Sequence, residues 1–184
     1  MKLVFATHND NKLKEVQQLL PENIELLSLK ETGDTLEENA KIKADFVTQT
    51  YGLDCFSDDT GLLVDALDGA PGVYSARYAG EQKNAGDNMS KLLSELEGGT
   101  DRSAHFKTVV HLNLKGESFT FDGIVEGQIT TKQHGKGGFG YDPIFRPDGY
   151  NKTFGELPPE TKNAISHRGR AIQKLVGFLK KKAT

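Results

Sequence analysis

The sequence has 184 residues, of which 27% are charged, and its formal net charge is −3. This length allows one domain with a substantial hydrophobic core, and the charge gives no overall basic bias toward nucleic acid. No apolar stretch suits a membrane span or a signal peptide, and the single cysteine, Cys55, excludes an internal disulfide or a pair of zinc thiolates. We therefore expect a cytoplasmic protein that has neither a membrane nor a nucleic acid as partner.

The first predicted element is a buried strand at residues 2–6, followed by the polar loop Thr7-His8-Asn9-Asp10-Asn11-Lys12. A helix follows, with apolar residues at helical spacing: Leu13, Val16 and Leu20. A strand, a loop and a helix N-terminus in series form an anion site, because free N–H groups and the positive end of the helix dipole face the loop. Lys12 in the first turn is unfavourable for the helix, which suits a phosphate-binding lysine; a solvated lysine is the alternative.

A second strand is predicted at Ile24–Leu29, and a helix begins after Thr35. Thr35 and Glu38 match a capping box, with Thr35 as N-cap and Glu38 at N3. The helix runs to about Tyr51, with one face formed by Ala40, Ala44, Val47 and Tyr51. Capping alone would explain Glu38; a metal-ligand role requires that the start of this helix points toward Asp59.

Two adjacent aspartates, Asp58 and Asp59, follow the predicted strand end at residues 54–57. Thr60 and Gly61 are expected to turn the chain into a second apolar run, Leu62–Leu67. Because successive strand side chains point to opposite faces, we expect one aspartate to face a cleft and the other to face inward. The alternative is an Asx turn, in which one carboxylate binds the backbone two residues on.

The next segments predict a short helix and a β-hairpin. Asp87 is expected to cap a helix that carries Leu92, Leu93 and Leu96 and ends at Gly98-Gly99. Residues 104–114 alternate like a half-buried antiparallel strand, which turns at residues 115–117 into a partner at 118–129. His105 and His111 fall on the predicted exposed face and lack the spacing of a zinc site.

Residues 135–140, Gly-Lys-Gly-Gly-Phe-Gly, formally match a dinucleotide fingerprint. We reject that interpretation because the fingerprint must open a helix, whereas Tyr141-Asp142-Pro143 follows and favours extended backbone. A loop that lets backbone amides approach a base or a phosphate is more plausible. Phe139 and Tyr141 supply aromatic faces, one of which can equally be core.

The predicted C-terminal helix begins after the segment 160–169, which follows Pro158-Pro159. Its buried stripe is expected to contain Ile172, Leu175, Val176 and Leu179. His167 and Arg168 lie near the helix start, where a cation gains nothing from the dipole, so both are well placed to bind a ligand.

Four separated segments resemble the inosine/xanthosine triphosphate pyrophosphatases, house-cleaning enzymes for non-standard purine nucleotides. The segments, in this order and at suitable spacing, are Thr7–Lys12, Ser57–Gly80, Gly138–Pro143 and Ser166–Gly169. Each motif alone is weak, but the ordered set is specific and the resemblance covers essentially the whole chain. One departure is His8, where many members carry glycine; we expect a small effect, although the larger side chain can crowd the phosphate site.

The resemblance implies a single α/β domain, residues 1–184, with an elongated, twisted mixed sheet, flanking helices and two lobes around an active-site cleft. It also implies a homodimer. The implied reaction is Mg²⁺-dependent hydrolysis of ITP, dITP and XTP to the nucleoside monophosphate and pyrophosphate, which cleanses the nucleotide pool.

Site residues are carried over from the family by position. Thr7–Lys12 and Lys162 would bind phosphates, Glu38 and Asp59 would hold Mg²⁺, whose hard character suits carboxylate oxygen, and Asp59 would also be the general base. Thr60 would contact the substrate. Asp58 is left outside the site, as an outer ligand or a residue that orients the turn.

The base would rest against Phe139, Gly140, Tyr141 and Asp142 and be read by His167 and Arg168. Arginine has only donors, so it matches the 6-oxo group of hypoxanthine or xanthine and leaves the 6-amino group of adenine unpaired. Guanine also has a 6-oxo group, and its exclusion is not explained in this way.

Two other functions fit parts of the sequence. Asp58-Asp59-Thr60-Gly61 faintly resembles the phosphoribosyl-pyrophosphate loop of phosphoribosyltransferases, but the longer spacer between the acidic residues and Thr-Gly is absent. A non-catalytic nucleotide-binding module would bind ITP with magnesium and never hydrolyse it.

Overall fold

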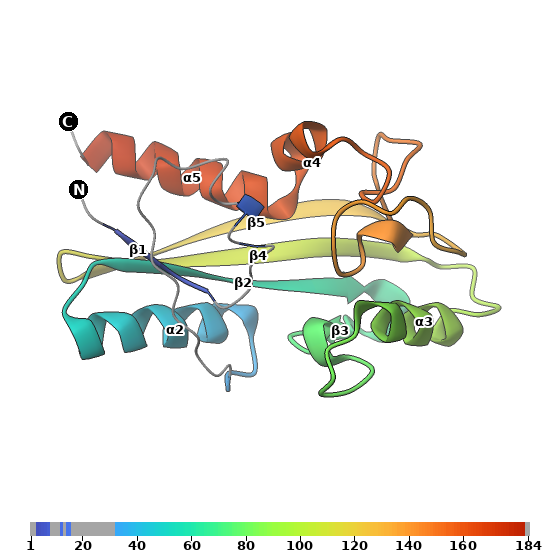
Figure 1. Ribbon diagram of the computed structural model, residues 1–184, viewed down its shortest axis with the longest axis horizontal. Coiled ribbons are helices and arrows are strands. Elements are labelled where there is room, and N and C mark those ends of the chain that lie inside the picture. The colour runs from blue at the N-terminus through green and yellow to red at the C-terminus, as the bar shows by residue number, and fades with distance from the viewer. Residues whose placement is uncertain (1–2, 8–11, 13, 16–31, 183–184) are drawn as a thin grey trace. The chain divides into compact units, whose positions relative to one another are not determined.

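The computed structural model describes residues 3–7, 12, 14–15 and 32–182 (Figure 1). The helix predicted from Leu13, Val16 and Leu20 lies largely outside these residues, although Lys12, Lys14 and Glu15 are helical. The strand predicted at Ile24–Leu29 also lies outside them. The chain forms two compact units. Unit 1 comprises residues 1–59, 108–123 and 167–184, and unit 2 comprises residues 60–107 and 124–166.

The described residues form a mixed α/β fold built on a six-stranded sheet. The strands are β1 (Val4–Ala6), β2 (Cys55–Val64), β3 (Pro71–Gly72), β4 (Ser103–Leu114), β5 (Glu117–Ile129) and β6 (Phe145–Pro147). Their order is β1-β2-β4-β5-β6, with β3 paired to β2. β1 is parallel to β2, whereas the β2–β3 and β5–β6 pairs are antiparallel. The mixed sheet predicted from the family resemblance is thus confirmed.

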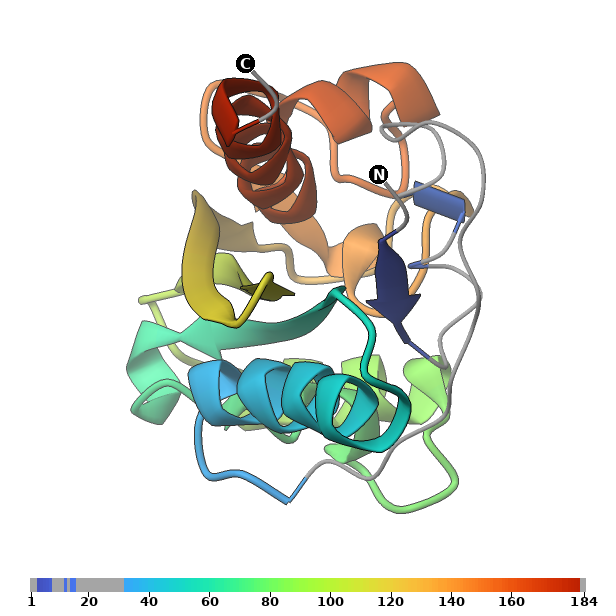
Figure 2. The same ribbon diagram turned by 90° about the vertical axis from the view of Figure 1, so that its left-hand side faces the viewer.

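Helices α2 (Leu36–Tyr51) and α5 (His167–Lys182) cover opposite faces of the strands in unit 1 (Figure 2). The α5 side has a core that contains Phe5, Phe56, Val110, Leu112, Ala171, Ile172 and Leu175. The α2 side has a smaller core with Val4, Ala6, Ala44, Val47 and Cys55. In unit 2, α3 (Ala85–Glu95) packs its Met89 and Leu92 into a third core with Leu62, Val64 and Phe106. Along the part of the chain that the structure describes, no helix is both long and apolar enough to cross a membrane.

The capping box predicted for α2 is confirmed. The Thr35 side chain accepts the Glu38 N–H at 3.1 Å, and Glu38 Oε2 accepts the Thr35 N–H at 3.2 Å. Ala40, Ala44 and Val47 are buried as expected, but Tyr51 is 51% exposed. Tyr51 is the last residue of the helix, since Gly52 follows in the left-handed conformation with φ 65°, so its side chain lies beyond the covered part of the face.

The turn predicted at Thr60-Gly61 is wrong. β2 runs without interruption from Cys55 to Val64, and a 3₁₀ turn at Asp65–Leu67 follows. The Asx-turn alternative is wrong for the same reason, because Asp58 and Asp59 lie inside a paired strand. Polar residues occur here within a strand because the local structure supplies partners for them, which the sequence pattern does not show.

The hairpin of β4 and β5 confirms the predicted turn. Lys115 and Gly116 both have positive φ, 51° and 83°, which is the conformation of a two-residue hairpin turn that follows the twist of the strands. The half-buried character predicted for β4 fails at its end, where His111 is 6% exposed and Asn113 is 7% exposed. Helix α2 covers them: Asn113 Nδ2 donates to Asp45 Oδ1 at 2.8 Å.

Two smaller differences concern helices, and one further expectation is confirmed. Asn84, not Asp87, caps α3, because the Asn84 side chain accepts the Asp87 N–H. Residues 159–165 form a short helix, α4 (Pro159–Ile165), that periodicity did not predict. The Gly-rich loop at 135–140 leads into a 3₁₀ turn, Asp142–Ile144, and not into a helix, as expected.

Candidate active site

The register of the parallel strands brings two sequence-predicted segments together. Ala6, the last residue of β1, is paired with Ser57 on β2. The loop that begins at Thr7 therefore starts beside Asp58, in the place where parallel strands commonly form ligand sites. Thr7 is buried. His8, Asn9, Asp10 and Asn11 lie outside the described residues.

Asp58 has a fully buried carboxylate surrounded by cations. Its Oδ1 lies 3.3 Å from Lys12 Nζ, and Arg168 Nε donates to its Oδ2 at 3.2 Å. Burial alone would raise the pKa of Asp58, but the charges of Lys12, Arg168 and Lys43 hold this pKa well below its ordinary range. The carboxylate is therefore ionised in the folded protein, and it is a part of the site that sequence reasoning left out.

Asp59 is the carboxylate at this position that solvent can reach. It is 5% exposed, against 0% for Asp58. Its Oδ1 lies 3.7 Å from Lys43 Nζ and 4.0 Å from Lys12 Nζ. Of the two neighbouring acids, Asp59 is thus the more exposed, and its role as a ligand- or water-binding residue stays a prediction.

Lys43 is a buried lysine that the sequence analysis missed. Its Nζ donates to the Asp58 carbonyl oxygen at 2.7 Å, and the residue is 3% exposed. A signal was present, because Lys43 lies on the same face of α2 as Ala40 and Val47. A lysine on an otherwise apolar helical face needs a buried partner, and β2 supplies it.

Arg168 lies at the start of α5, as predicted, but its guanidinium faces carboxylates of unit 1. It is hydrogen-bonded to Glu15 through Nη1 and to Asp58 through Nε. Burial would lower the pKa of Arg168, but Glu15 and Asp58 raise it. Arg168 is only 1% exposed, so in this structure its guanidinium holds the two carboxylates in place. Its neighbour His167 is also buried.

Glu38 occupies the capping box, since its Oε2 accepts the N–H groups of Asp34 and Thr35 at 2.8 Å and 3.2 Å. Within the described ranges, no three His, Cys, Asp or Glu side chains gather into a group that could hold a metal ion. Magnesium commonly uses only one or two protein carboxylates together with phosphate oxygens of the substrate. The chemistry of Asp59, a buried carboxylate with some exposure, fits this pattern.

A second group of predicted residues gathers in unit 2. Lys162 Nζ donates to Asp142 Oδ2 at 2.7 Å, and the same oxygen accepts the Phe139 N–H at 2.7 Å. Lys162 Nζ also lies 4.8 Å from the centre of the Phe139 ring. The salt bridge therefore fixes the loop that carries Phe139, and Lys162, predicted to bind phosphate, here has a carboxylate partner.

The glycines of the loop 135–140 make room for protein atoms more than for a ligand. A Cβ at Gly138 would overlap the Asp142 carboxylate, and one at Gly135 would overlap the Gly155 backbone. Gly140, with φ 61°, has open space where its Cβ would lie. Access by a ligand is therefore expected at Gly140.

The two aromatic residues of this group have different surroundings. Tyr141 is 4% exposed and packs in the core of unit 2, and its hydroxyl donates to the Ser75 carbonyl at 2.9 Å. Phe139 is half-buried. The expectation that one of these two residues is core is confirmed for Tyr141, and Phe139 is the more exposed of the two rings. Thr60, also in unit 2, is half-buried.

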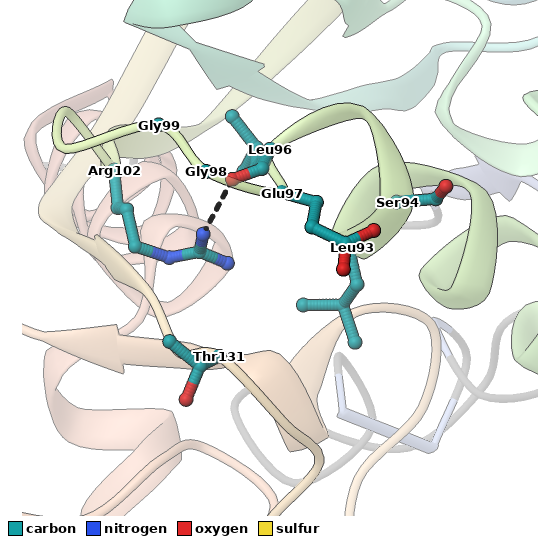
Figure 3. Close-up of a pocket in the computed structure, with 8 residues that line it drawn as sticks. All are labelled: Leu93, Ser94, Leu96, Glu97, Gly98, Gly99, Arg102 and Thr131. Atoms are coloured by element: carbon teal, nitrogen blue, oxygen red, sulfur yellow. Dashed lines mark hydrogen bonds between the residues drawn. The ribbon is translucent and has the colours of Figure 1, made fainter.

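A pocket of about 450 Å³ at the end of α3 is lined by Leu93, Glu97 and Arg102, among others (Figure 3). Arg102 donates to the carbonyl oxygens of Leu96, Ile129 and Thr130. These bonds close the C-terminus of α3 and attach it to the end of β5. They give Arg102 a structural role, and none of the catalytic, substrate-binding or metal-binding residues predicted from the sequence lines this pocket.

The mixed sheet and the buried group of aspartates, lysines and arginine define an α/β protein with a site suited to phosphate chemistry. The Ham1 family model matches residues 3–178, and the chain belongs to this family. It is 60% identical over 188 residues to the dITP/XTP pyrophosphatase of Flavobacterium johnsoniae, and the alignment covers 97% of this chain and 98% of that relative.

Solved structures agree with this assignment. The Staphylococcus aureus Ham1 protein superimposes with a TM-score of 0.91 at 38% identity, over 99% of this chain and 100% of that chain. The nucleoside-triphosphatase or dITP/XTP pyrophosphatase of Mycobacterium abscessus gives a TM-score of 0.78 at 40% identity, over 95% and 98% of the two chains. The family resemblance inferred from the sequence is confirmed.

Proposed function

We propose that the protein hydrolyses ITP, dITP and XTP to the nucleoside monophosphate and pyrophosphate with the help of Mg²⁺. Membership of the Ham1 family and full-length relatives named dITP/XTP pyrophosphatase make the chain an enzyme of the nucleoside triphosphate pyrophosphatase class. A cytoplasmic location and a homodimeric state are part of the proposal.

The observation that carries the proposal is the buried ionic group around β2, which we call the Asp58–Asp59 cluster. It contains Lys12, Lys43 and Arg168 as cations, with Asp58, Asp59 and Glu15 as anions. Lysine and arginine side chains next to two ionisable carboxylates supply what phosphoryl transfer needs, namely charge stabilisation and a proton acceptor.

Asp59 is the proposed general base. Its greater exposure lets it accept the proton of a water molecule that attacks the α-phosphorus, while Asp58 stays bound to Arg168 and Lys12. Lys12 and Lys43 would offset charge on the phosphate oxygens and on the departing pyrophosphate. Asp59, substrate phosphate oxygens and, by the family resemblance, Glu38 would hold Mg²⁺, which would stabilise the developing negative charge.

Charge balance supports the need for a divalent cation. The cluster pairs each of its cations with a carboxylate. A triphosphate would add further negative charge beside Asp58 and Asp59, and lysines that are already shared offset only part of it. A metal ion supplies the missing positive charge.

From the family resemblance, base recognition is assigned to Phe139, Gly140, Tyr141, Asp142, His167 and Arg168, with Thr7–Lys12, Thr60 and Lys162 as further substrate contacts. For Arg168 to read a 6-oxo group, its guanidinium must exchange a bond to Glu15 or Asp58 for the base. A base that cannot accept this bond leaves the arginine with its carboxylates, and selectivity follows from that difference.

The proposal is tested with pure protein, Mg²⁺ and a panel of ITP, dITP, XTP, GTP, ATP and CTP, with pyrophosphate and orthophosphate measured separately. We expect pyrophosphate from ITP, dITP and XTP at far higher kcat/KM than from ATP or CTP. Release of pyrophosphate without a base acceptor excludes a phosphoribosyltransferase. Binding of ITP without any turnover would identify a binding module.

Isotope labelling tests the position of attack. In ¹⁸O-water the label should appear in the nucleoside monophosphate, because water attacks the α-phosphorus. Label in pyrophosphate would show attack at the β-phosphorus and would contradict the proposed position of the base.

A further inference from the structure

Gly123 on β5 lies directly against the backbone of the first turn of α5. A Cβ atom at this position would overlap the carbonyl oxygen of His167 and would lie 2.6 Å from the Ala171 nitrogen. Both obstacles are backbone atoms, which cannot rotate away as a side chain can. Any larger residue at 123 must therefore displace the N-terminal turn of α5 from the strand.

The requirement for glycine here is space, not backbone conformation. The φ of Gly123 lies outside the left-handed region, whereas the turn glycines Gly116 and Gly138 have φ of 83° and 71°. An alanine could adopt the backbone of Gly123 without strain. The alanine side chain would, however, require α5 to move away from β5.

The first turn of α5, which packs against Gly123, contains Arg168. Arg168 Nε reaches Asp58 Oδ2 at 3.2 Å, close to the limit for such a bond, and the side chain has almost no exposed surface. A shift of the turn by several tenths of an ångström is enough to lengthen this bond beyond hydrogen-bonding distance. The position of the guanidinium thus depends on the missing side chain of Gly123.

We propose that Gly123 is a positioning residue for Arg168: by lacking a side chain it seats the start of α5 on β5, so that the guanidinium is held between Asp58 and Glu15. The consequence for substrate selectivity rests on the proposed function. The effect on the Arg168 side chain does not, and it can be measured without substrate.

The test is Gly123→Ala with two matched glycine controls. Gly177→Ala lies on α5 itself and meets nothing within 4 Å. Gly127→Ala lies on β5, four residues along, and meets Arg146 and Pro147 backbone atoms of β6. Gly177→Ala shows the effect of an added methyl group on α5 without crowding. Gly127→Ala shows the effect of crowding β5 at a position that does not contact α5.

The readout independent of activity is the ¹⁵N–¹H resonance of Arg168 Nε. We expect Gly123→Ala to shift or broaden it and to speed its exchange with water, and we expect neither control to do so. An unchanged Arg168 resonance in folded Gly123→Ala protein would overturn the proposal. Failure of Gly123→Ala to fold at low temperature would also overturn it, because the residue would then be structural only.

The kinetic readout is the ratio of kcat/KM for ITP to that for ATP. A lost hydrogen bond to a charged group corresponds to a change of about 10- to 100-fold in this ratio. We expect Gly123→Ala to lower the ratio at least about tenfold, through a higher KM for ITP, and we expect both controls to leave the ratio unchanged. Combined with Arg168→Lys, Gly123→Ala should reduce the ratio no further. Additive losses would contradict the coupling, whereas equal wild-type rates on ITP and ATP would refute the proposed function and leave the resonance test intact.

Discussion

Asp58 and Asp59 are chemically identical neighbours, yet their surroundings give them different roles. Asp58 is 0% exposed and lies between Arg168 and Lys12, so its charge serves the structure of the site. Asp59 retains 5% exposure and has Lys43 and Lys12 at longer distances. The difference in exposure therefore supports the proposal that Asp59, and not Asp58, meets water or substrate.

Isosteric substitutions should separate these two roles. Asp59→Asn should keep the stability of the fold and lower kcat by about 10²–10⁴-fold, the usual effect of losing a general base. Asp58→Asn should lower the free energy of unfolding by about 3–5 kcal/mol, because it leaves a buried cation short of its partner. Urea denaturation and steady-state kinetics of both variants measure the difference. Near-normal turnover by folded Asp59→Asn would remove it from the mechanism.

Glu38 has two candidate roles, capping and metal binding, that one pair of variants distinguishes. Glutamine also forms a capping box, so Glu38→Gln should keep α2 and its stability while removing a negative ligand. Glu38→Ala should lose about 1 kcal/mol of stability in addition. If Glu38 binds magnesium, both variants need more Mg²⁺ for half-maximal activity. An unchanged magnesium titration for Glu38→Gln would leave capping as its only role.

At the scale of elements, α2 is held to the sheet by polar contacts as well as by its apolar face. Asp45 of α2 accepts from Asn113 of β4, and Ser57 of β2 donates to the Ala40 carbonyl. His111 of β4 lies in the same layer, with its Nδ1 3.2 Å from Thr120 Oγ1 on β5. Protonation of His111 would thus place a positive charge in the buried region between α2 and the sheet.

The stability of the protein should depend on His111 in mild acid. Burial lowers the pKa of His111; Lys41 lowers it further, and Asp45 and the hydrogen bond with Asn113 oppose the shift. The folded state binds this proton less tightly than the unfolded chain. Stability should therefore fall as pH drops below the ordinary histidine value of about 6.5.

The measurement is the urea midpoint of wild type and His111→Gln between pH 5 and 8. The wild-type midpoint should decline below about pH 6.5, and the decline should be smaller in His111→Gln because the variant has no proton to bind at this position. Parallel curves for the two proteins would assign the acid sensitivity to other groups.

At the scale of the whole molecule, a ligand that binds only the folded protein must raise its stability. An ITP analogue with a methylene bridge between the α- and β-phosphorus resists the proposed hydrolysis and permits this measurement on wild type. At about 100 times its Kd, with Mg²⁺, it should add about 2.7 kcal/mol to the free energy of unfolding. The matched ATP analogue at the same concentration should add much less. Equal stabilisation by both would place base discrimination after binding.

The sequence by itself determined elements whose signals are local. The capping box of Thr35 and Glu38, the hairpin turn at Lys115-Gly116, the rejection of the dinucleotide fingerprint and the start of α5 near His167 depend on a few neighbouring residues. The family was likewise determined, because its ordered motifs extend along the chain.

Only the tertiary structure decided which polar side chains are partners. The sequence analysis did not single out Lys43 or Glu15, and it treated Asp58 as a possible turn residue. Strand pairing and helix packing bring these three residues, which are far apart in the sequence, into one group with Arg168. The burial of His111 required a helix from another part of the chain to cover the strand. The need for glycine at 123 appears only when α5 lies on β5. These properties depend on distances between segments, and a sequence pattern specifies the segments without the distances.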